Sequence, residues 1–251
     1  MTYDFSGKSM LLTGGTGGLG RNLIKYFLDC NLKLIIVTYR SEKEMQSLKS
    51  ELANAHSVQQ QQKSSSSSST EIEFIQTDIT NQGQVKNLIS NIFEKYGQIH
   101  ILVNLVGGYI GGKSIIELEE SEWDKMMDIN LKSAFLISKN IMPKMIENRY
   151  GKLVHISSRT GVKAEGNDSA YAASKAGLVR FVESVSKEVK NYNININCIL
   201  PTIIDTEHNR KAMPNADFTK WLKPEDLSNV ILFLCSDHSK LINGAAIPTY
   251  G

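Results

Sequence analysis

A tyrosine and a lysine one helical turn apart are the residues in this chain best suited to proton chemistry. Tyr171 and Lys175 lie in a stretch from about residue 168 that favours a helix, with Asn167 or Asp168 as its N-cap. Side chains four residues apart leave the same helix face, so the Lys175 ammonium can stabilise the ionised phenol and lower the tyrosine pKa. A phenol whose pKa falls from ~10 toward neutrality can exchange a proton with a substrate oxygen.

A serine hydroxyl precedes this helix. Ser158 follows the apolar run at residues 153–156, so it can form a hydrogen bond with the same substrate oxygen. A Tyr-x-x-x-Lys pair also arises by chance on helices, where the tyrosine packs on the core and the lysine is solvated. The elements around the pair decide between these two interpretations.

A glycine-rich loop lies between the first apolar run and the first helical pattern. Residues 8–13 indicate a buried strand, and apolar residues recur at helical spacing after residue 20. Glycine permits positive φ and lets backbone N–H groups approach a phosphate, to which the helix N-terminus adds its dipole. The order of strand, glycine loop and helix favours nucleotide binding over a tight structural turn. The candidate cofactor-binding residues of this loop are Gly14, Thr16, Gly18, Leu19 and Gly20.

The residues after the second apolar run bear on the choice of nucleotide. Residues 32–38 are followed by Tyr39 and Arg40, with no carboxylate before Glu42. In dinucleotide-binding folds a carboxylate at this point accepts the ribose 2′-hydroxyl, whereas an arginine accommodates a 2′-phosphate. Arg40 therefore favours NADP(H), with NAD(H) also possible. The alternative is an ordinary loop arginine.

Predicted strands and helices alternate along all 251 residues. This alternation predicts an α/β protein of one domain: a doubly wound parallel sheet (Rossmann fold) of about seven strands, with helices on both faces. Residues 57–70 are rich in Gln and Ser and cannot form a core, so they are predicted to be a disordered insertion within that domain. Ser121 is predicted to cap a helix that contains Asn130.

Composition excludes several function classes. The formal net charge is +2, which gives no strong field for nucleic acid or an anionic membrane. No apolar run approaches the roughly 18 residues of a membrane span, and the first residues do not resemble a signal peptide. Three separated cysteines suggest reduced thiols, and the five histidines lack ligand spacing. We therefore expect a cytoplasmic protein with no metal site.

The motifs together resemble those of the short-chain dehydrogenase/reductase family over the whole chain. Residues 13–20 are similar to its Thr-Gly-x-x-x-Gly-x-Gly cofactor loop, and residues 104–107 are a variant of its Asn-Asn-Ala-Gly segment. Ser158 and Tyr171 are thirteen positions apart, as is usual in the family.

The resemblance implies hydride transfer between a nicotinamide and a carbonyl or alcohol carbon of a small molecule. It implies that Tyr171 is the acid or base, that Lys175 lowers its pKa and holds the nicotinamide ribose, and that Ser158 polarises the carbonyl. Asn130 would position a water that links Lys175 to solvent. The cofactor contacts implied elsewhere in the chain are Asp78, Asn104, Gly107, Pro201, Ile204 and Thr206. The resemblance also implies a homo-oligomer, either a tetramer or a dimer.

Two alternatives remain open. Residues 205–218 resemble the corresponding segment of dihydropteridine reductases, so a quinonoid dihydropterin is an alternative substrate. Those enzymes typically lack the serine and favour NADH, whereas this chain has Ser158 and Arg40. The second alternative is a non-catalytic NADP-binding protein that regulates a partner, against which the presence of Ser158, Tyr171 and Lys175 argues.

Overall fold

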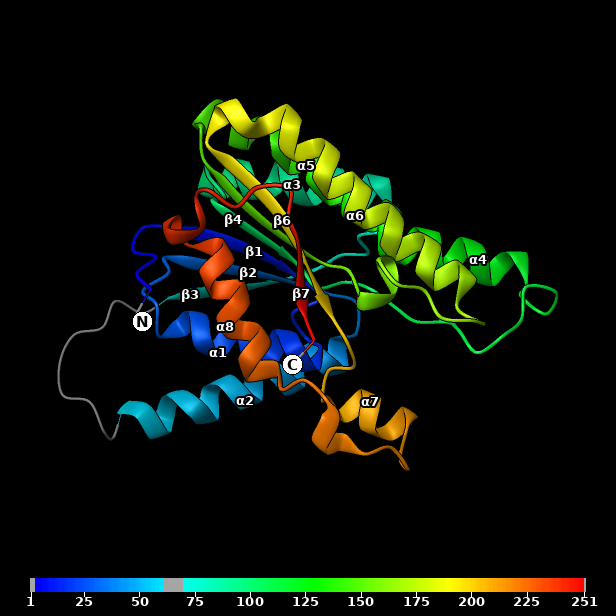
Figure 1. Ribbon diagram of the computed structural model, residues 1–251. Helices are drawn as coiled ribbons and strands as arrows, with labels where there is room; N and C mark the ends of the chain where they lie inside the picture. Colours follow the sequence, from blue (N-terminus) through cyan, green and yellow to red (C-terminus); the bar gives the residue numbers. More distant parts are fainter. Residues whose placement is uncertain (1–2, 61–69, 251) are drawn as a thin grey trace.

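Seven parallel strands form the centre of the structure (Figure 1). The computed structural model describes residues 3–60 and 70–250. The strands are β1 (Ser9–Thr13), β2 (Leu34–Tyr39), β3 (Glu71–Gln76), β4 (Ile101–Asn104), β5 (Gly151–Ile156), β6 (Ile194–Pro201) and β7 (Ala246–Thr249). They lie in the order β3-β2-β1-β4-β5-β6-β7. Most central strand residues are buried, because helices cover both faces of a parallel sheet and its strands are largely apolar.

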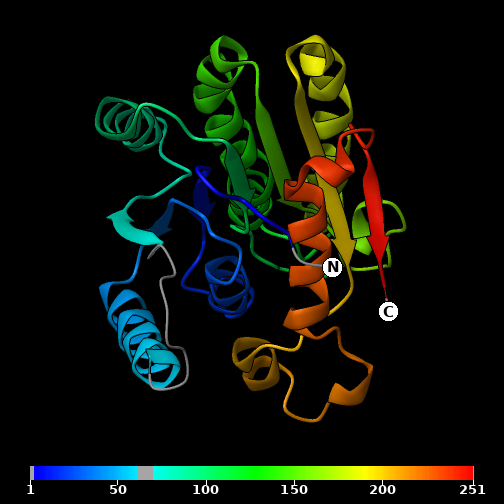
Figure 2. The same cartoon turned by 90° about the vertical axis from the view of Figure 1, so that its left-hand side faces the viewer.

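Two helical layers enclose the sheet (Figures 1 and 2). The long helices are α1 (Gly18–Leu28), α2 (Glu42–Gln60), α3 (Gln82–Tyr96), α5 (Ser133–Asn148), α6 (Ser169–Val189) and α8 (Pro224–Cys235). Successive strand residues face opposite sides. Leu11 of β1 packs in a core with α3, α5 and α6, whereas its neighbours Met10 and Leu12 pack in a second core with α1, α2 and α8. The predicted doubly wound sheet is confirmed.

The strand order reverses at the centre of the sheet. From β1 the chain moves outward to β2 and β3, then returns to place β4 on the other side of β1. In open α/β sheets, ligands bind at the carboxyl ends of the strands beside such a reversal. Thr13 and Asn104 end β1 and β4 and are partners in register. The fold therefore places the expected binding crevice beside these two residues.

The predicted Gln/Ser-rich insertion at about 57–70 begins inside a helix. Helix α2 continues to Gln60, beyond the end of its apolar spacing, because glutamine has a high helix propensity. Thr70 directly precedes β3. The rest of the predicted insertion, residues 61–69, lies outside the described residues.

One predicted helix start is wrong, and the structure adds a short helix. Helix α4 (Glu120–Met127) begins before Ser121, with Glu119 as its N-cap, because the Glu122 carboxylate accepts a hydrogen bond from the Glu119 backbone N–H at 3.2 Å. A short helix, α7 (Glu207–Ala212), forms in the polar stretch after β6. Within residues 3–60 and 70–250, no helix is both long and apolar enough to cross a membrane.

Candidate active site

The loop between β1 and α1 requires glycine at particular positions. Gly14 has a φ of 71°, which favours glycine. A Cβ at Gly20 would lie 2.5 Å from the Gly15 Cα, and a Cβ at Gly18 would lie 2.8 Å from the Thr206 Cγ2. Gly17 caps α1 without a side-chain hydrogen bond. The first backbone N–H groups of α1 thus have no side-chain cap, an arrangement that suits an anion such as a pyrophosphate.

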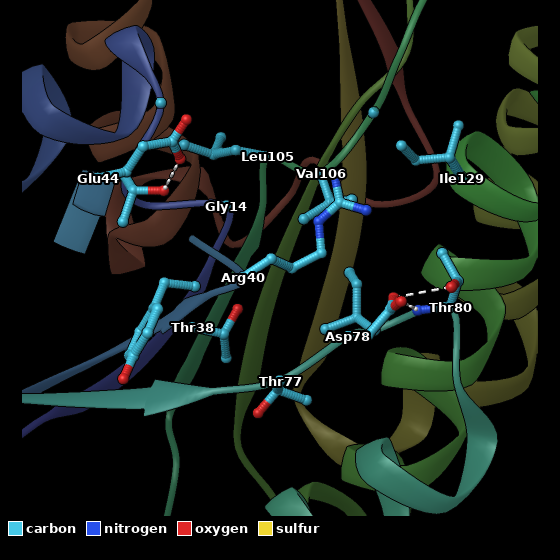
Figure 3. A pocket seen from close by; sticks show the side chains of 15 residues that line it. Gly14, Thr38, Arg40, Glu44, Thr77, Asp78, Thr80, Leu105, Val106 and Ile129 are labelled. Atoms are coloured by element: carbon cyan, nitrogen blue, oxygen red, sulfur yellow. Dashed lines mark hydrogen bonds between the residues drawn. The ribbon is translucent and has the colours of Figure 1, made fainter. Parts of the chain in front are cut away.

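A cavity of about 280 Å³ opens at the carboxyl ends of the central strands. Five predicted cofactor-binding residues line it, namely Gly14, Thr16, Arg40, Asp78 and Gly107. Figure 3 shows the Arg40 side chain extending into this cavity, with Glu44 on one side and Asp78 on the other. Its volume is near the lower limit of about 300 Å³ for small-molecule sites, so it suits one part of a dinucleotide. Gly18, Leu19 and Gly20 lie outside this lining, at the start of α1.

Asp78 is held in an ionised form beside the cavity. Burial opposes its ionisation, but hydrogen bonds from the Thr80 hydroxyl at 2.7 Å and backbone N–H at 2.9 Å outweigh it. The charge of Arg40 acts in the same direction, and the pKa of Asp78 lies below its usual value. Asp78 and Arg40 therefore form a charged wall of the cavity.

Asn104 lies inside the sheet instead of in the cavity lining. Its Oδ1 accepts a hydrogen bond from the Thr13 hydroxyl at 2.5 Å, and its amide nitrogen lies 3.2 Å from Nδ1 of His155. The other ring nitrogen of His155 lies 3.1 Å from the Ser138 hydroxyl. Burial lowers the pKa of His155 to about 3, so the ring is neutral and accepts from Asn104. Asn104 thus joins the ends of β1, β4 and β5. The direct cofactor contact that the family resemblance implies for Asn104 stays a prediction.

Asn130 clamps the loop that follows β4. Its Oδ1 accepts from the Gly108 backbone N–H at 2.9 Å, and its amide nitrogen donates to the Gly108 carbonyl at 3.0 Å and to the Ser174 hydroxyl at 3.0 Å. A Cβ at Gly107 would lie 3.0 Å from Asn130 Oδ1 and 3.2 Å from Lys175 Nζ. Because Gly107 lines the cavity, this end of the cavity lies close to the side chains of Asn130 and Lys175.

Asn130 lies in a π-helical turn. Residues 128–132 are π-helical and continue α4 into α5 without a break. The Ser133 backbone N–H donates to the Asp128 carbonyl, so the Ile129 carbonyl loses its usual α-helical partner. The Ser133 hydroxyl replaces that partner at 2.6 Å. Such turns are frequent at functional sites.

Tyr171 and Lys175 lie on one face of α6, as their spacing predicts. The Ser158 hydroxyl lies within hydrogen-bonding reach of Tyr171. Lys175 is buried, donates to the Ile156 carbonyl at 2.8 Å, and has its Nζ 5.8 Å from the centroid of the Tyr171 ring. The four predicted catalytic residues, Asn130, Ser158, Tyr171 and Lys175, thus lie at one end of the sheet.

The electrostatics of this pair differ from the sequence-based expectation. Burial raises the pKa of Tyr171, against a lowering hydrogen bond from Ser158, and the charge of Asp168 raises it further. Burial lowers the pKa of Lys175 to about 8. The expected lowering of the Tyr171 pKa by Lys175 is therefore not found, because the cost of burying a phenolate dominates.

Tyr109, which the sequence did not single out, lies against Tyr171. The Tyr109 ring packs edge-on against the Tyr171 ring, with centroids 5.0 Å apart, and its hydroxyl donates to Asp168 at 2.9 Å. The backbone N–H of Gly112 donates to the Asn167 carbonyl at 2.8 Å. The loop after β4 is thus joined to the start of α6. The Gly-Gly-Tyr-Ile-Gly-Gly run at 107–112 was the available signal, since glycine permits positive φ, as at Gly112, and close approach of other groups, as at Gly111 beside Asp168.

The segment after β6 packs against the glycine loop. Thr206 caps α7 by accepting from the Asn209 backbone N–H at 3.2 Å, and its methyl group lies against Gly18. Ile204 forms a β-bridge with Leu222, and Pro201 ends β6. Of the three residues predicted here, Thr206 is the one placed beside the start of α1.

Among the described residues, no three His, Cys, Asp or Glu side chains gather to hold a metal ion.

Comparisons with known proteins agree with this geometry. The chain is 28% identical over 249 residues to the 3-oxoacyl-acyl-carrier-protein reductase FabG of Thermotoga maritima, covering 96% of this chain and 95% of the relative. It is 27% identical to the corresponding reductase of Aquifex aeolicus, over 100% of this chain and 99% of the relative. A crystal structure of a putative gluconate dehydrogenase from Agrobacterium tumefaciens superposes with a TM-score of 0.87 at 26% identity, over 100% of this chain and 97% of that one. The sequence profile of the family described as short chain dehydrogenase matches residues 8–217. The chain therefore belongs to the short-chain dehydrogenase family of oxidoreductases, which act on carbonyl or hydroxyl groups with a nicotinamide cofactor.

Proposed function

We propose that the protein reduces the carbonyl group of a small molecule, or oxidises the corresponding alcohol, with NADP(H) as preferred cofactor and Tyr171 as acid or base. The observation that carries this proposal is the position of Tyr171, within reach of the Ser158 hydroxyl and on the same helix face as Lys175. The names of the relatives support the substrate class, since a 3-oxoacyl group contains a ketone.

The cofactor site would be formed by the glycine loop and the cavity beside it. The uncapped start of α1 suits the pyrophosphate, and Arg40 in the cavity suits a 2′-phosphate. Gly107 has no side chain to fill the space beside Asn130 and Lys175, which leaves that end open to the nicotinamide ribose. The residues present therefore fit a dinucleotide.

The nicotinamide, when bound, supplies or accepts the hydride. The Ser158 hydroxyl would donate a hydrogen bond to the carbonyl oxygen, and Tyr171 would donate the proton that this oxygen gains on reduction. Because burial raises the Tyr171 pKa, the phenol is protonated at neutral pH, which is the form that reduction requires. The Lys175 ammonium would stabilise the phenolate as the proton leaves.

The decisive test is the variant Tyr171→Phe in a screen of carbonyl substrates that follows NADPH oxidation. Removal of the proton donor should lower kcat by about 10²- to 10⁴-fold while cofactor still binds. Tyr192→Phe, in the 3₁₀ turn after α6, is a matched control and should keep its activity. Retention of more than about a tenth of kcat in Tyr171→Phe would show that another group is the acid.

Two outcomes of the same screen would support the alternatives. Cofactor binding without turnover of any substrate would favour a regulatory NADP-binding protein. Faster turnover of a quinonoid dihydropterin with NADH would favour a dihydropteridine reductase-like enzyme. The position of Ser158 beside Tyr171 argues for the carbonyl reaction.

A further inference from the structure

A carboxylate lies in the cofactor cavity beside the arginine expected to bind a 2′-phosphate. Glu44, in the first turn of α2, lines the same cavity as Arg40 and Thr16. Its Oε2 accepts a hydrogen bond from the Thr16 hydroxyl at 3.1 Å, which holds the carboxylate against the glycine loop. Figure 3 shows Glu44 and Asp78 on opposite sides of the Arg40 side chain.

The glycine loop and α2 are tied together at this point. Arg21 of α1 donates to the Thr16 carbonyl at 2.8 Å and to the Glu44 carbonyl at 2.9 Å. The same guanidinium pairs with Glu51 at 2.9 Å. These contacts fix the backbone on both sides of the Thr16–Glu44 bond, so the Glu44 carboxylate stays at the cavity wall.

A carboxylate and a guanidinium favour different substituents at the ribose 2′ position. A carboxylate accepts hydrogen bonds from ribose hydroxyls and repels a phosphate, whereas a guanidinium attracts the phosphate. The hydroxyl of Thr16 has one proton, so while it donates to Glu44 it cannot donate to a phosphate oxygen. This cavity contains both kinds of group, and the carboxylate comes from a position four residues after Arg40.

We propose that Glu44 is a specificity-determining residue whose charge opposes a 2′-phosphate and so offsets part of the preference for NADP(H) that Arg40 provides. The proposal rests on the nicotinamide cofactor proposed above. It predicts that the affinities of the native protein for NAD(H) and NADP(H) differ less than they would if Arg40 acted without Glu44.

A purely structural role for Glu44 makes a different prediction. Glu42 also lies in the first turn of α2, so the helix dipole is stabilised without Glu44. If Glu44 only anchored the glycine loop, its replacement would change the binding of every adenine nucleotide by the same factor. A role in specificity changes the ratio between nucleotides that differ at the 2′ position.

The test is calorimetric binding of adenosine 2′,5′-bisphosphate and of 5′-AMP, which differ in the 2′-phosphate alone. Glu44→Gln keeps an acceptor for Thr16 and removes the charge. It should strengthen bisphosphate binding relative to 5′-AMP by about tenfold, and the gain should shrink as salt is raised. Glu44→Asp, which keeps the charge, should leave the ratio near that of the native protein. Glu94→Gln on α3, outside the cavity lining, is the control for net charge and should also leave it unchanged.

The outcomes separate this proposal from the proposed activity. An unchanged ratio in Glu44→Gln, an equal change for both nucleotides, or a gain that does not depend on salt would overturn the role of Glu44. None of these results bears on Tyr171, because no turnover is measured. Failure of the native protein to bind either nucleotide would overturn the proposed cofactor and the role of Glu44 with it.

Discussion

Replacement of Lys175 by methionine should abolish activity but raise stability at neutral pH. Lys175 is only 4% exposed, and burial lowers its pKa from 10.5 to about 8. The unfolded chain therefore binds this proton more tightly than the folded protein does. This difference lowers the free energy of unfolding by about 3 kcal/mol at pH 7. Methionine removes that cost, although it leaves the Ile156 carbonyl without its donor, at a cost of about 2 kcal/mol. The net gain at pH 7 is about 1 kcal/mol.

The dependence of this gain on pH is the sharper measurement. Below pH 8 the lysine is charged in both states and the full cost applies; the cost falls as the pH rises from 8 toward 10.5, where both states lose the proton. The stability difference between Lys175→Met and the native protein should therefore fall by about 2–3 kcal/mol between pH 7 and pH 10. Urea unfolding followed by circular dichroism measures it. Lys187→Met, exposed on the same helix, is the control and should show no such trend.

A difference that stays constant across this pH range would refute the reasoning. It would mean that the buried ammonium is stabilised as well as it is in water. Lys175 would then keep its ordinary affinity for a proton in the folded protein.

Three further predictions concern the cofactor, the core and assembly. Arg40→Ala should raise the KM for NADPH about tenfold or more and barely alter the KM for NADH, and Tyr39→Asp should shift the cofactor preference toward NADH. Native turnover that is faster with NADH than with NADPH would contradict this prediction. His155→Leu leaves the amide of Asn104 without its acceptor and should lower the free energy of unfolding by about 1–3 kcal/mol in urea titrations, and unchanged stability would show that the buried hydrogen-bond chain contributes little. The α5 and α6 helices should form a homo-oligomer interface, since Phe135 is 41% exposed beside apolar neighbours; a monomer mass in sedimentation at micromolar concentration would count against it.

Much of the fold follows from local sequence. Continuous apolar runs identify the strands of a parallel sheet, and Pro224 and Gly97 are local signals for the start of α8 and the end of α3. The Tyr171 and Lys175 spacing places both side chains on one helix face whatever surrounds them. These features depend on residues near one another in the chain.

The rest depends on contacts between distant segments. The raised pKa of Tyr171 follows from burial and from the charge of Asp168, neither of which a spacing of four residues contains. Tyr109 reaches Asp168 across 59 positions of the chain, and Thr16 reaches Glu44 across 28. A sequence pattern predicts on which face of its own helix or strand a side chain lies. It does not predict which group from a distant segment contacts that side chain.

The π-helical turn at 128–132 has a consequence for how the chain can change in length. The i→i+5 bond of this turn encloses one more residue than an α-helical turn does, so removal of one residue would restore α-helical geometry and leave α5 almost unrotated relative to α4. Asn130 would then change its direction relative to Gly108, while the apolar face of α5 would stay in the core. A single deletion at 128–132 should therefore disturb the contact of Asn130 with Gly108 more than the packing of α5. The number of residues between α4 and α5 is as much a part of the site as the identity of Asn130.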